Sequence, residues 1–375
     1  MTLAVGVEQV LAWRMSRNLL SPIGTTDVVG VASRLCGVQA QVASSAELAV
    51  RIRREKSQAG EVADALAKGD LIKTWAMRGT LHLLPPGEAG NFLSLMAASR
   101  LWERPSWEKY FGVGPDQIER LRGVVRDALV DRALTREELV EAVIAEGSLA
   151  RVADALRSGW GTLLKPLSWQ GDICHAPAEG NRVAFMRPEA VSPGWREVPD
   201  PDDAAPAAIT SYLGAYGPAT ADEFGNWLAG GWFGKRRLRA WFDSLGDLLA
   251  EVEVAGERAF VPAEHVDELV AARPNVDVRL LPGFDQYVLG PGTKDPHIIP
   301  PGRRPLVSKQ SGWIAPVVVC GGLVSGTWEI DDGALRVSWF DELGKPPMRA
   351  LGDESDRLSG IVGTTLVLEV APTPG

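Results

Sequence analysis

The sequence has few of the residues on which many enzymes and secreted proteins depend. Three cysteines, Cys36, Cys174 and Cys320, lie far apart among 375 residues. An odd number at such spacing fits neither a disulfide framework nor a cysteine metal site, so we expect a reducing cytoplasm. The four histidines are scattered, and no HExxH, CxxC, GxSxG or GKS/GKT motif occurs. These absences argue against zinc enzymes, serine hydrolases and phosphate-loop hydrolases, and we expect no metal and no cofactor.

Long apolar runs are also lacking. The longest, Trp313 to Val324, contains a proline and two glycines and is too short to span a bilayer. At the N-terminus, Glu8, Arg14 and Arg17 interrupt any segment that could serve as a signal peptide. We therefore expect a protein without membrane association.

Positive charge is scarce overall but unevenly distributed. The net charge is −9, yet residues 1–134 hold 17 Lys/Arg against 14 Asp/Glu, a balance of +3. The remainder holds 22 against 34, a balance of −12. The weakly basic N-terminal part can still face phosphates, and any contact with nucleic acid must be local and of modest non-specific affinity.

The chain repeats one order of elements, several helices followed by a β-hairpin, which is typical of a winged helix. The hairpins are expected at 72–84, at 173–186 with a turn at 179–181, and at 249–261 with a turn at 255–257. Helical patterns precede them at 7–19, 25–36, 45–55, 59–68, 115–129, 136–143, 151–165, 221–227 and 235–249. Thr135 and Thr220 each open a capping box, and they lie 85 residues apart. We interpret this repetition as three tandem winged-helix units.

From about residue 276 the pattern changes to short apolar strands separated by Gly/Pro turns, with a long loop at 290–312. This pattern predicts a small β domain of barrel-like form. The fold class is therefore α+β, with predicted domains at 1–112, 113–200, 201–275 and 276–375. Asp285 and Tyr287, which precede the long loop, are expected to cap it.

Two glutamines stand one residue apart in Gly37-Val38-Gln39-Ala40-Gln41. In a helix they would point about 200° apart, so joint action requires an extended or loop backbone. Gly37 is expected to end the helix at 25–36, for which Thr25 or Thr26 is the expected cap, and the pair Ser44-Ser45 to cap the next helix. Two neutral amides can orient a water molecule but are poor bases. Alternatively, the amides satisfy backbone groups at the junction, or one binds adenine in a major groove.

Other candidates have equally plain structural explanations. His82, on the first hairpin, is either a satisfied structural histidine or a functional residue. Arg78 either contacts a phosphate or covers the hairpin. The cluster from Lys235 to Arg239 is either a solvated helix start or a DNA contact.

Four segments in order resemble the AlkZ-like winged-helix DNA glycosylases. They are Leu35 to Gln41, Thr74 to His82, Leu281 to Gly290 and Val324 to Trp328. The resemblance implies a monofunctional enzyme that removes N7-alkylated purines from double-stranded DNA, with Gln39 and Gln41 as the catalytic residues. It also implies tandem winged helices and a C-terminal β-barrel. Members from antibiotic producers release bulky genotoxin adducts or interstrand crosslinks, which suggests a role in self-resistance.

The resemblance also directs attention to side chains that could contact the DNA. The expected DNA-binding residues are Arg51, Arg54, Arg78, Thr80, His82, Lys235, Arg236 and Arg237. We expect a monomer with no protein partner. Two other functions remain open, a winged-helix transcriptional regulator and a protein that binds alkylated DNA without cutting it. Both would bind DNA without releasing a base.

Overall fold

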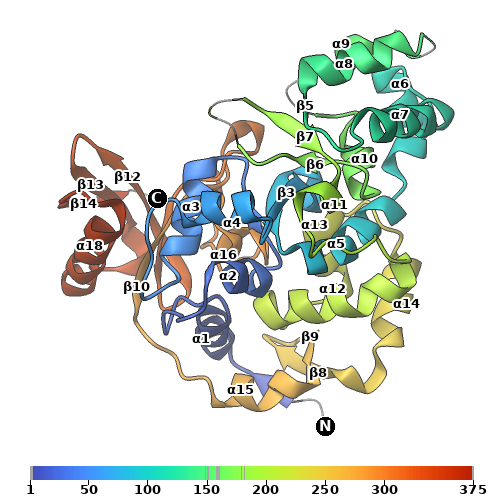
Figure 1. Ribbon diagram of the computed structural model, residues 1–375. Helices are drawn as coiled ribbons and strands as arrows, with labels where there is room; N and C mark the ends of the chain where they lie inside the picture. The colour runs from blue at the N-terminus through green and yellow to red at the C-terminus, as the bar shows by residue number, and fades with distance from the viewer. Residues whose placement is uncertain are drawn as a thin grey trace. The chain divides into compact units, whose positions relative to one another are not determined.

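The computed structural model describes residues 3–147, 149, 152–157, 161–178, 180 and 182–373. The chain forms two compact units, and each gathers segments that are distant in the sequence. Unit 1 comprises Met1–Glu61, Ile209–Trp227 and Leu245–Gly375, and unit 2 comprises Val62–Ala208 and Leu228–Ser244. Helices and strands are mixed along the chain, which confirms the α+β class (Figure 1). The four predicted domains stay a prediction, because these units follow spatial proximity and not chain order.

The elements of unit 1 come from three stretches of the chain. They are β1 (Leu3–Val5), α1 (Val7–Arg17), α2 (Val28–Arg34), β2 (Val38–Gln39), α3 (Ala43–Arg51), β8 (Leu249–Val254), β9 (Glu257–Pro262), α15 (Val266–Ala271), β10 (Val278–Leu281), α16 (Gln286–Leu289), α17 (Arg304–Val307), β11 (Val317–Cys320), β12 (Leu323–Asp331), β13 (Ala334–Phe340), α18 (Met348–Val362) and β14 (Val367–Thr373). The helices α4 (Glu61–Lys68), α12 (Pro201–Tyr216) and α13 (Ala221–Ala229) have residues in both units.

The remaining elements belong to unit 2. They are β3 (Ile72–Trp75), β4 (Leu81–Leu84), α5 (Pro86–Ala98), α6 (Pro105–Phe111), α7 (Pro115–Ala128), β5 (Leu134–Thr135), α8 (Arg136–Ala145), α9 (Ala153–Arg157), α10 (Lys165–Trp169), β6 (Cys174–His175), β7 (Ala184–Met186), α11 (Pro188–Val191) and α14 (Lys235–Ser244).

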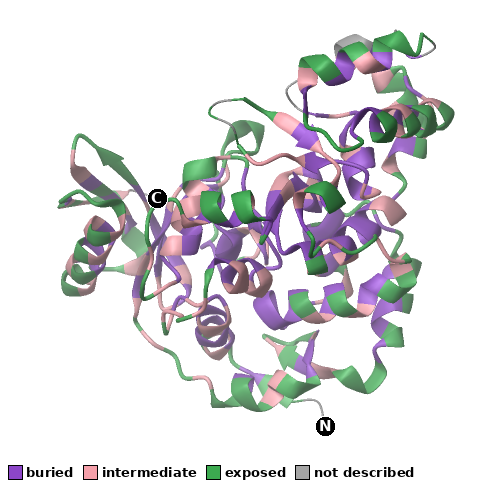
Figure 2. Ribbon diagram, viewed as in Figure 1, coloured by how far each residue is buried: buried purple, intermediate pink, exposed green. Residues whose placement is uncertain are grey.

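The C-terminal strands form an open sheet. Their order is β10-β11-β12-β13-β14, and among the described residues β10 and β14 remain at the edges. The barrel-like prediction is therefore wrong. The last strand, β14, pairs parallel to β13. It follows α18, a helix missed by the sequence analysis, whose Leu351 and Leu358 pack into the core with Leu280 and Val318 of the sheet (Figures 1 and 2). A helix thus covers one face of this sheet, where a barrel would need the sheet to close on itself.

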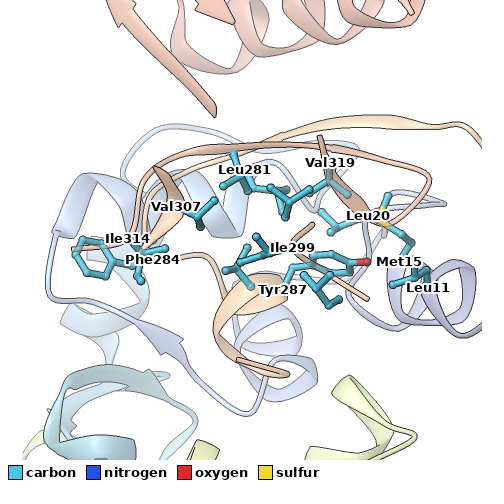
Figure 3. Packing of buried hydrophobic residues seen from close by; sticks show 14 of the residues in the cluster. Leu11, Met15, Leu20, Leu281, Phe284, Tyr287, Ile299, Val307, Ile314 and Val319 are labelled. Atoms are coloured by element: carbon cyan, nitrogen blue, oxygen red, sulfur yellow. The ribbon is translucent and has the colours of Figure 1, made fainter. Parts of the chain in front are cut away.

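A second core in unit 1 joins the start of the chain to its C-terminal part. Leu11, Met15 and Leu20 pack with Tyr287, Ile299 and other apolar side chains from residues 281–340 (Figure 3). The Tyr287 hydroxyl donates a hydrogen bond to Gly322 O at 2.7 Å, which satisfies its one polar group. The first helix therefore depends on residues that lie about three hundred positions away in sequence for its core.

The first two predicted hairpins share one sheet in unit 2. Strands β4, β3, β6, β7 and β5 are hydrogen-bonded in that order. The two hairpins are joined where Lys73 of β3 pairs with His175 of β6 in antiparallel orientation. Both hairpins are confirmed as antiparallel pairs. Of the predicted second turn, Glu179 and Asn181 lie outside the described residues.

The third hairpin, β8–β9, is confirmed and turns at Ala255 and Gly256. Both turn residues have positive φ, 51° and 85°, as a tight two-residue turn of this kind requires. Strand β1 adds to it in parallel through β8, a pairing that the sequence analysis did not predict.

Three local predictions are wrong. The cap of α2 is Asp27, whose carboxylate accepts the Gly30 N–H at 2.7 Å, and not Thr25 or Thr26. The pair Ser44-Ser45 lies inside α3, which begins after Val42 without a side-chain cap. The helix expected at 151–165 is interrupted: α9 ends at Arg157, α10 begins at Lys165, and Gly161 between them has a φ of 63°, which a helix does not accommodate. Residues 158–160 lie outside the described residues.

Candidate active site

The segment before the two glutamines is a helix end of defined geometry. The Gly37 N–H bonds Ala32 O at 2.7 Å and the Cys36 N–H bonds Ser33 O at 3.0 Å, the two hydrogen bonds of a Schellman motif. Cys36 and Gly37 have φ values of 52° and 97°. The predicted helix stop is thus confirmed, with Cys36 as well as Gly37 in the left-handed region. Because this turn ends α2, the chain can continue as the extended strand β2.

The two glutamines differ in exposure. Gln39 is in β2 and only 6% exposed, Ala40 is 2% exposed, and Gln41 is exposed at a bend. The extended backbone predicted for this segment is confirmed at Gln39. One amide is thus enclosed by protein and the other faces solvent. Their joint action on one target stays a prediction.

Helix α3 begins two residues after Gln41. Its N-cap, Val42, supplies no side-chain acceptor for the backbone N–H groups of the first turn. Ala43 and Ser44 are exposed. The positive end of a helix dipole therefore lies immediately after the glutamine segment in sequence, and it favours negative charge nearby.

The other end of α3 is anchored by a buried ion pair. The Arg53 guanidinium donates to both carboxylate oxygens of Asp285, at 2.7 and 2.6 Å, and both side chains are 0% exposed. Arg53 also donates to Asn18 O at 2.9 Å and Ala49 O at 2.8 Å. Asp285 in turn accepts the Tyr287 N–H at 2.8 Å and caps α16. Asp285 thus caps α16 and not the loop at 290–312, and its pairing with Arg53 was missed.

A tyrosine fixes the end of α2. The Tyr216 hydroxyl donates a hydrogen bond to Leu35 O at 2.6 Å. The ring packs so closely on Gly290 that a Cβ there would lie 2.2 Å from a ring carbon. Burial raises the pKa of Tyr216 well above its usual value, so the hydroxyl stays protonated and keeps donating. The ends of α2 and α3 are thus both held by hydrogen bonds from buried side chains.

Of the predicted DNA-binding residues, Arg51 and Arg54 belong to unit 1. Arg54 donates to Thr26 O at 2.9 Å and to Glu61 at 2.6 Å, so its guanidinium already has protein partners. Arg51, in the last turn of α3, is partly exposed, and its Nε is buried without a hydrogen-bond partner among the described residues. Of the two, Arg51 retains the greater capacity to bind an anion.

Arg78, Thr80 and His82 belong to the β3–β4 hairpin of unit 2. Arg78 has a φ of 56° in the turn, and the Thr80 hydroxyl donates to Met77 O at 3.1 Å. His82 is 0% exposed and its Nδ1 lies 3.0 Å from Thr80 O. Burial, aided by the charge of Arg78, lowers the pKa of His82 to about 3. His82 is therefore neutral at pH 7, and its Nε2 is buried without a hydrogen-bond partner among the described residues.

Lys235, Arg236 and Arg237 lie at the exposed start of α14, also in unit 2. The Arg237 guanidinium lies 4.9 Å from the centre of the Trp241 ring and 3.5 Å from Asp202. Arg236 is exposed. The predicted DNA-binding residues thus fall into separate groups in the two units, and their roles remain predictions.

Neither a metal site nor a membrane helix is found in the part of the chain that the structure describes. No group of three or more His, Cys, Asp or Glu side chains there is placed to hold a metal ion. Among the same residues, no helix combines the length and apolar character that crossing a bilayer requires.

Comparison with known proteins connects these features. Residues 32–361 match the family model of AlkZ-like DNA glycosylases. This span includes both the segment with Gln39 and Gln41 and the β3–β4 hairpin. The chain belongs to the AlkZ-like DNA glycosylase family. It is similar to an interstrand DNA cross-link repair glycosylase of Streptomyces sahachiroi, with 47% identity over 95% of this chain and 96% of that protein.

The fold agrees with this assignment. The solved structure of the Streptomyces sahachiroi DNA glycosylase AlkZ superimposes with a TM-score of 0.96, at 45% identity, over 98% of this chain and 100% of that one. Family membership implies that the protein hydrolyses N-glycosyl bonds. The resemblance recognised from four short sequence segments is thereby confirmed.

Proposed function

We propose that this protein is a monofunctional DNA glycosylase that excises N7-alkylated purines, including bulky adducts and interstrand crosslinks. The observation that carries the proposal is the similarity, along almost the whole chain, to an interstrand DNA cross-link repair glycosylase. The substrate is double-stranded DNA, and the enzyme acts as a monomer without a cofactor. The biological role is self-resistance to a DNA-alkylating natural product.

The proposed chemistry uses Gln39 and Gln41. An N7-alkylated purine is cationic and leaves without protonation by a general acid, so the protein needs only to place water at C1′ and stabilise the developing charge. The burial of Gln39 supports a fixed dipole in a site of low dielectric, whereas the exposure of Gln41 supports contact with DNA or water. Removing one preorganised hydrogen-bonding group of this kind typically lowers kcat by about 10²–10³.

The proposed DNA-binding surface consists of three winged-helix units. The order of helices and hairpins supports this arrangement, as do the capping boxes at Thr135 and Thr220. Arg51, Arg78 and the start of α14 at Lys235 provide its phosphate contacts, while Arg54 contributes mainly through its pairing with Glu61. His82 is neutral and buried, so it provides no charge to this surface and supports the hairpin from within.

The test is base release in single-turnover reactions. Three duplexes are compared: one with N7-methylguanine, one treated with a bulky bifunctional N7-alkylating agent, and one undamaged. The proposal predicts alkali-labile strand breaks with the two damaged duplexes and none with the third. Intact strands in all three, with binding retained, would favour a regulator or a non-catalytic binder of alkylated DNA.

A further inference from the structure

Lys165 is a cation that no sequence motif indicated. It is the first residue of α10, which lies beside β3 in unit 2 (Figure 1). Its side chain extends over the turn of the β3–β4 hairpin. A Cβ built on Gly79 would lie 3.3 Å from Lys165 Cδ and 3.6 Å from Lys165 Nζ. The ammonium group therefore lies next to the glycine that follows Arg78.

The surroundings of this ammonium group supply no opposite charge. Burial lowers the pKa of Lys165, and no carboxylate raises that pKa in return. Among the described residues, no ion pair or hydrogen bond joins Lys165 to a carboxylate or a carbonyl oxygen. The carbonyls of Ala76, Met77 and Thr80 in the adjacent turn already accept hydrogen bonds within the hairpin. Lys165 keeps partial exposure to solvent, so an ammonium group without a protein acceptor is accessible to an anion from outside the chain.

The histidine of the hairpin does not alter this balance. His82 is buried and neutral, and the charged side chain that affects it is Arg78, not an acid. Gly79 thus has Arg78 next to it in sequence and the Lys165 side chain packed on it, in a chain whose net charge is −9. Such a local excess of positive charge is complementary to a phosphate group.

We propose that Lys165 and Arg78 together hold one backbone phosphate of the DNA at the β3–β4 turn. Lys165 acts as a point charge and Arg78 as a planar donor. The left-handed conformation at Gly79, φ 67°, together with the lack of a Cβ there, allows the lysine stem to lie across the turn. This inference rests on the proposed function, because it takes DNA as the ligand and adds a residue to its binding surface.

The experiment measures binding of an undamaged, fluorescently labelled DNA duplex over a range of salt concentrations. The variants are Lys165→Met, Lys165→Arg, Arg78→Met and the double methionine variant. Lys109→Met, at an exposed lysine on α6 of the same unit, is the matched control. Methionine keeps the apolar stem that packs on Gly79, and arginine keeps the charge.

Lys165→Met is expected to weaken binding about three- to tenfold near 100 mM salt, while Lys165→Arg retains most of the affinity. Each phosphate contact contributes about 0.9 to the slope of log K against log salt. Because the two cations share one phosphate, the double variant should lose about one unit of slope and not two. Unchanged affinity for Lys165→Met, or a double variant whose slope is unchanged or falls by nearly two, would refute the shared site.

Stability separates this proposal from a structural role. Removing a desolvated cation without a partner should leave the Tm of the free protein unchanged or raise it, whereas loss of a structural ion pair would lower it. A lower Tm for Lys165→Met would therefore overturn the proposal. The proposal would also be overturned if inorganic phosphate raised the Tm of the wild type but not of Lys165→Met, while both proteins bound DNA equally well. Since the probe is undamaged, DNA binding with the expected slopes but no base release would refute only the proposed function.

Discussion

The buried pair of Arg53 and Asp285 provides the most demanding test of how the glutamine segment is supported. We expect Asp285→Ala to destabilise unit 1 strongly. The substitution leaves the Arg53 guanidinium, 0% exposed, without the two hydrogen bonds of 2.7 and 2.6 Å that its partner accepts. It also removes the acceptor for the Tyr287 N–H at the start of α16.

The magnitude follows from these losses. Breaking a buried ion pair by removing one partner costs about 3–5 kcal/mol, and losing a helix cap adds about 1 kcal/mol. The total, about 4–6 kcal/mol, is a large share of the stability of an ordinary domain, which is roughly 5–15 kcal/mol. At about 2 °C per kcal/mol, the Tm should fall by roughly 8–12 °C.

The assay is urea unfolding at 25 °C together with thermal unfolding. Asp331→Ala is the matched control, because Asp331 pairs with Arg336 at the surface, with side-chain exposures of 62% and 46%. Surface pairs contribute about 0–1 kcal/mol, so this control should barely change the Tm. An Asp285→Ala variant as stable as the control would refute the reasoning.

A double variant checks the cause of the instability. Arg53→Met combined with Asp285→Leu removes both charges and keeps apolar volume. If the cost comes from an unpaired buried charge, the double variant should be more stable than the sum of the two single changes predicts, by about 2–3 kcal/mol. Additive effects would point to packing instead.

Three further predictions concern local features. The pKa of His82 is lowered from 6.5 to about 3 in the folded protein, so the unfolded chain takes up a proton first as the pH falls below 6.5. The free energy of unfolding should therefore fall between pH 6.5 and pH 3, by about 3 kcal/mol at pH 4.5. In urea unfolding, His82→Asn should remove this part of the pH dependence. Ala255→Asn should raise stability by about 0.5–1 kcal/mol, because Asn tolerates the φ of 51° better; a lower Tm would contradict this. Thr135→Ala should cost about 1 kcal/mol, because its hydroxyl caps α8; full stability in urea would show that the cap is dispensable.

Features encoded within a few residues were predictable from the sequence. The capping boxes at Thr135 and Thr220 and the three hairpins depend on neighbouring residues, and the structure contains them. The helix end before Gln39 was predictable from Gly37, although the left-handed conformation of Cys36 was not, because cysteine is not a residue that favours this conformation.

Features that depend on distant partners were missed. Strands β3 and β6 pair through a single pair of residues, Lys73 and His175. Arg53 was visible only as one of several arginines, because its partner lies 232 positions away. Lys165 lies in no basic run, and its importance follows only from its position over Gly79. The open C-terminal sheet was mistaken for a barrel because strand and turn patterns do not encode how the last strand pairs.

The central claim, catalysis through Gln39 and Gln41, is tested most directly by single-turnover base release from an N7-crosslinked duplex. Wild type is compared with Gln39→Ala, Gln41→Ala and the double variant, with Tm and duplex binding measured for each. The account predicts that each single change slows release by about 10²–10³ while binding and folding are preserved. Release at the wild-type rate by a folded double variant would contradict it.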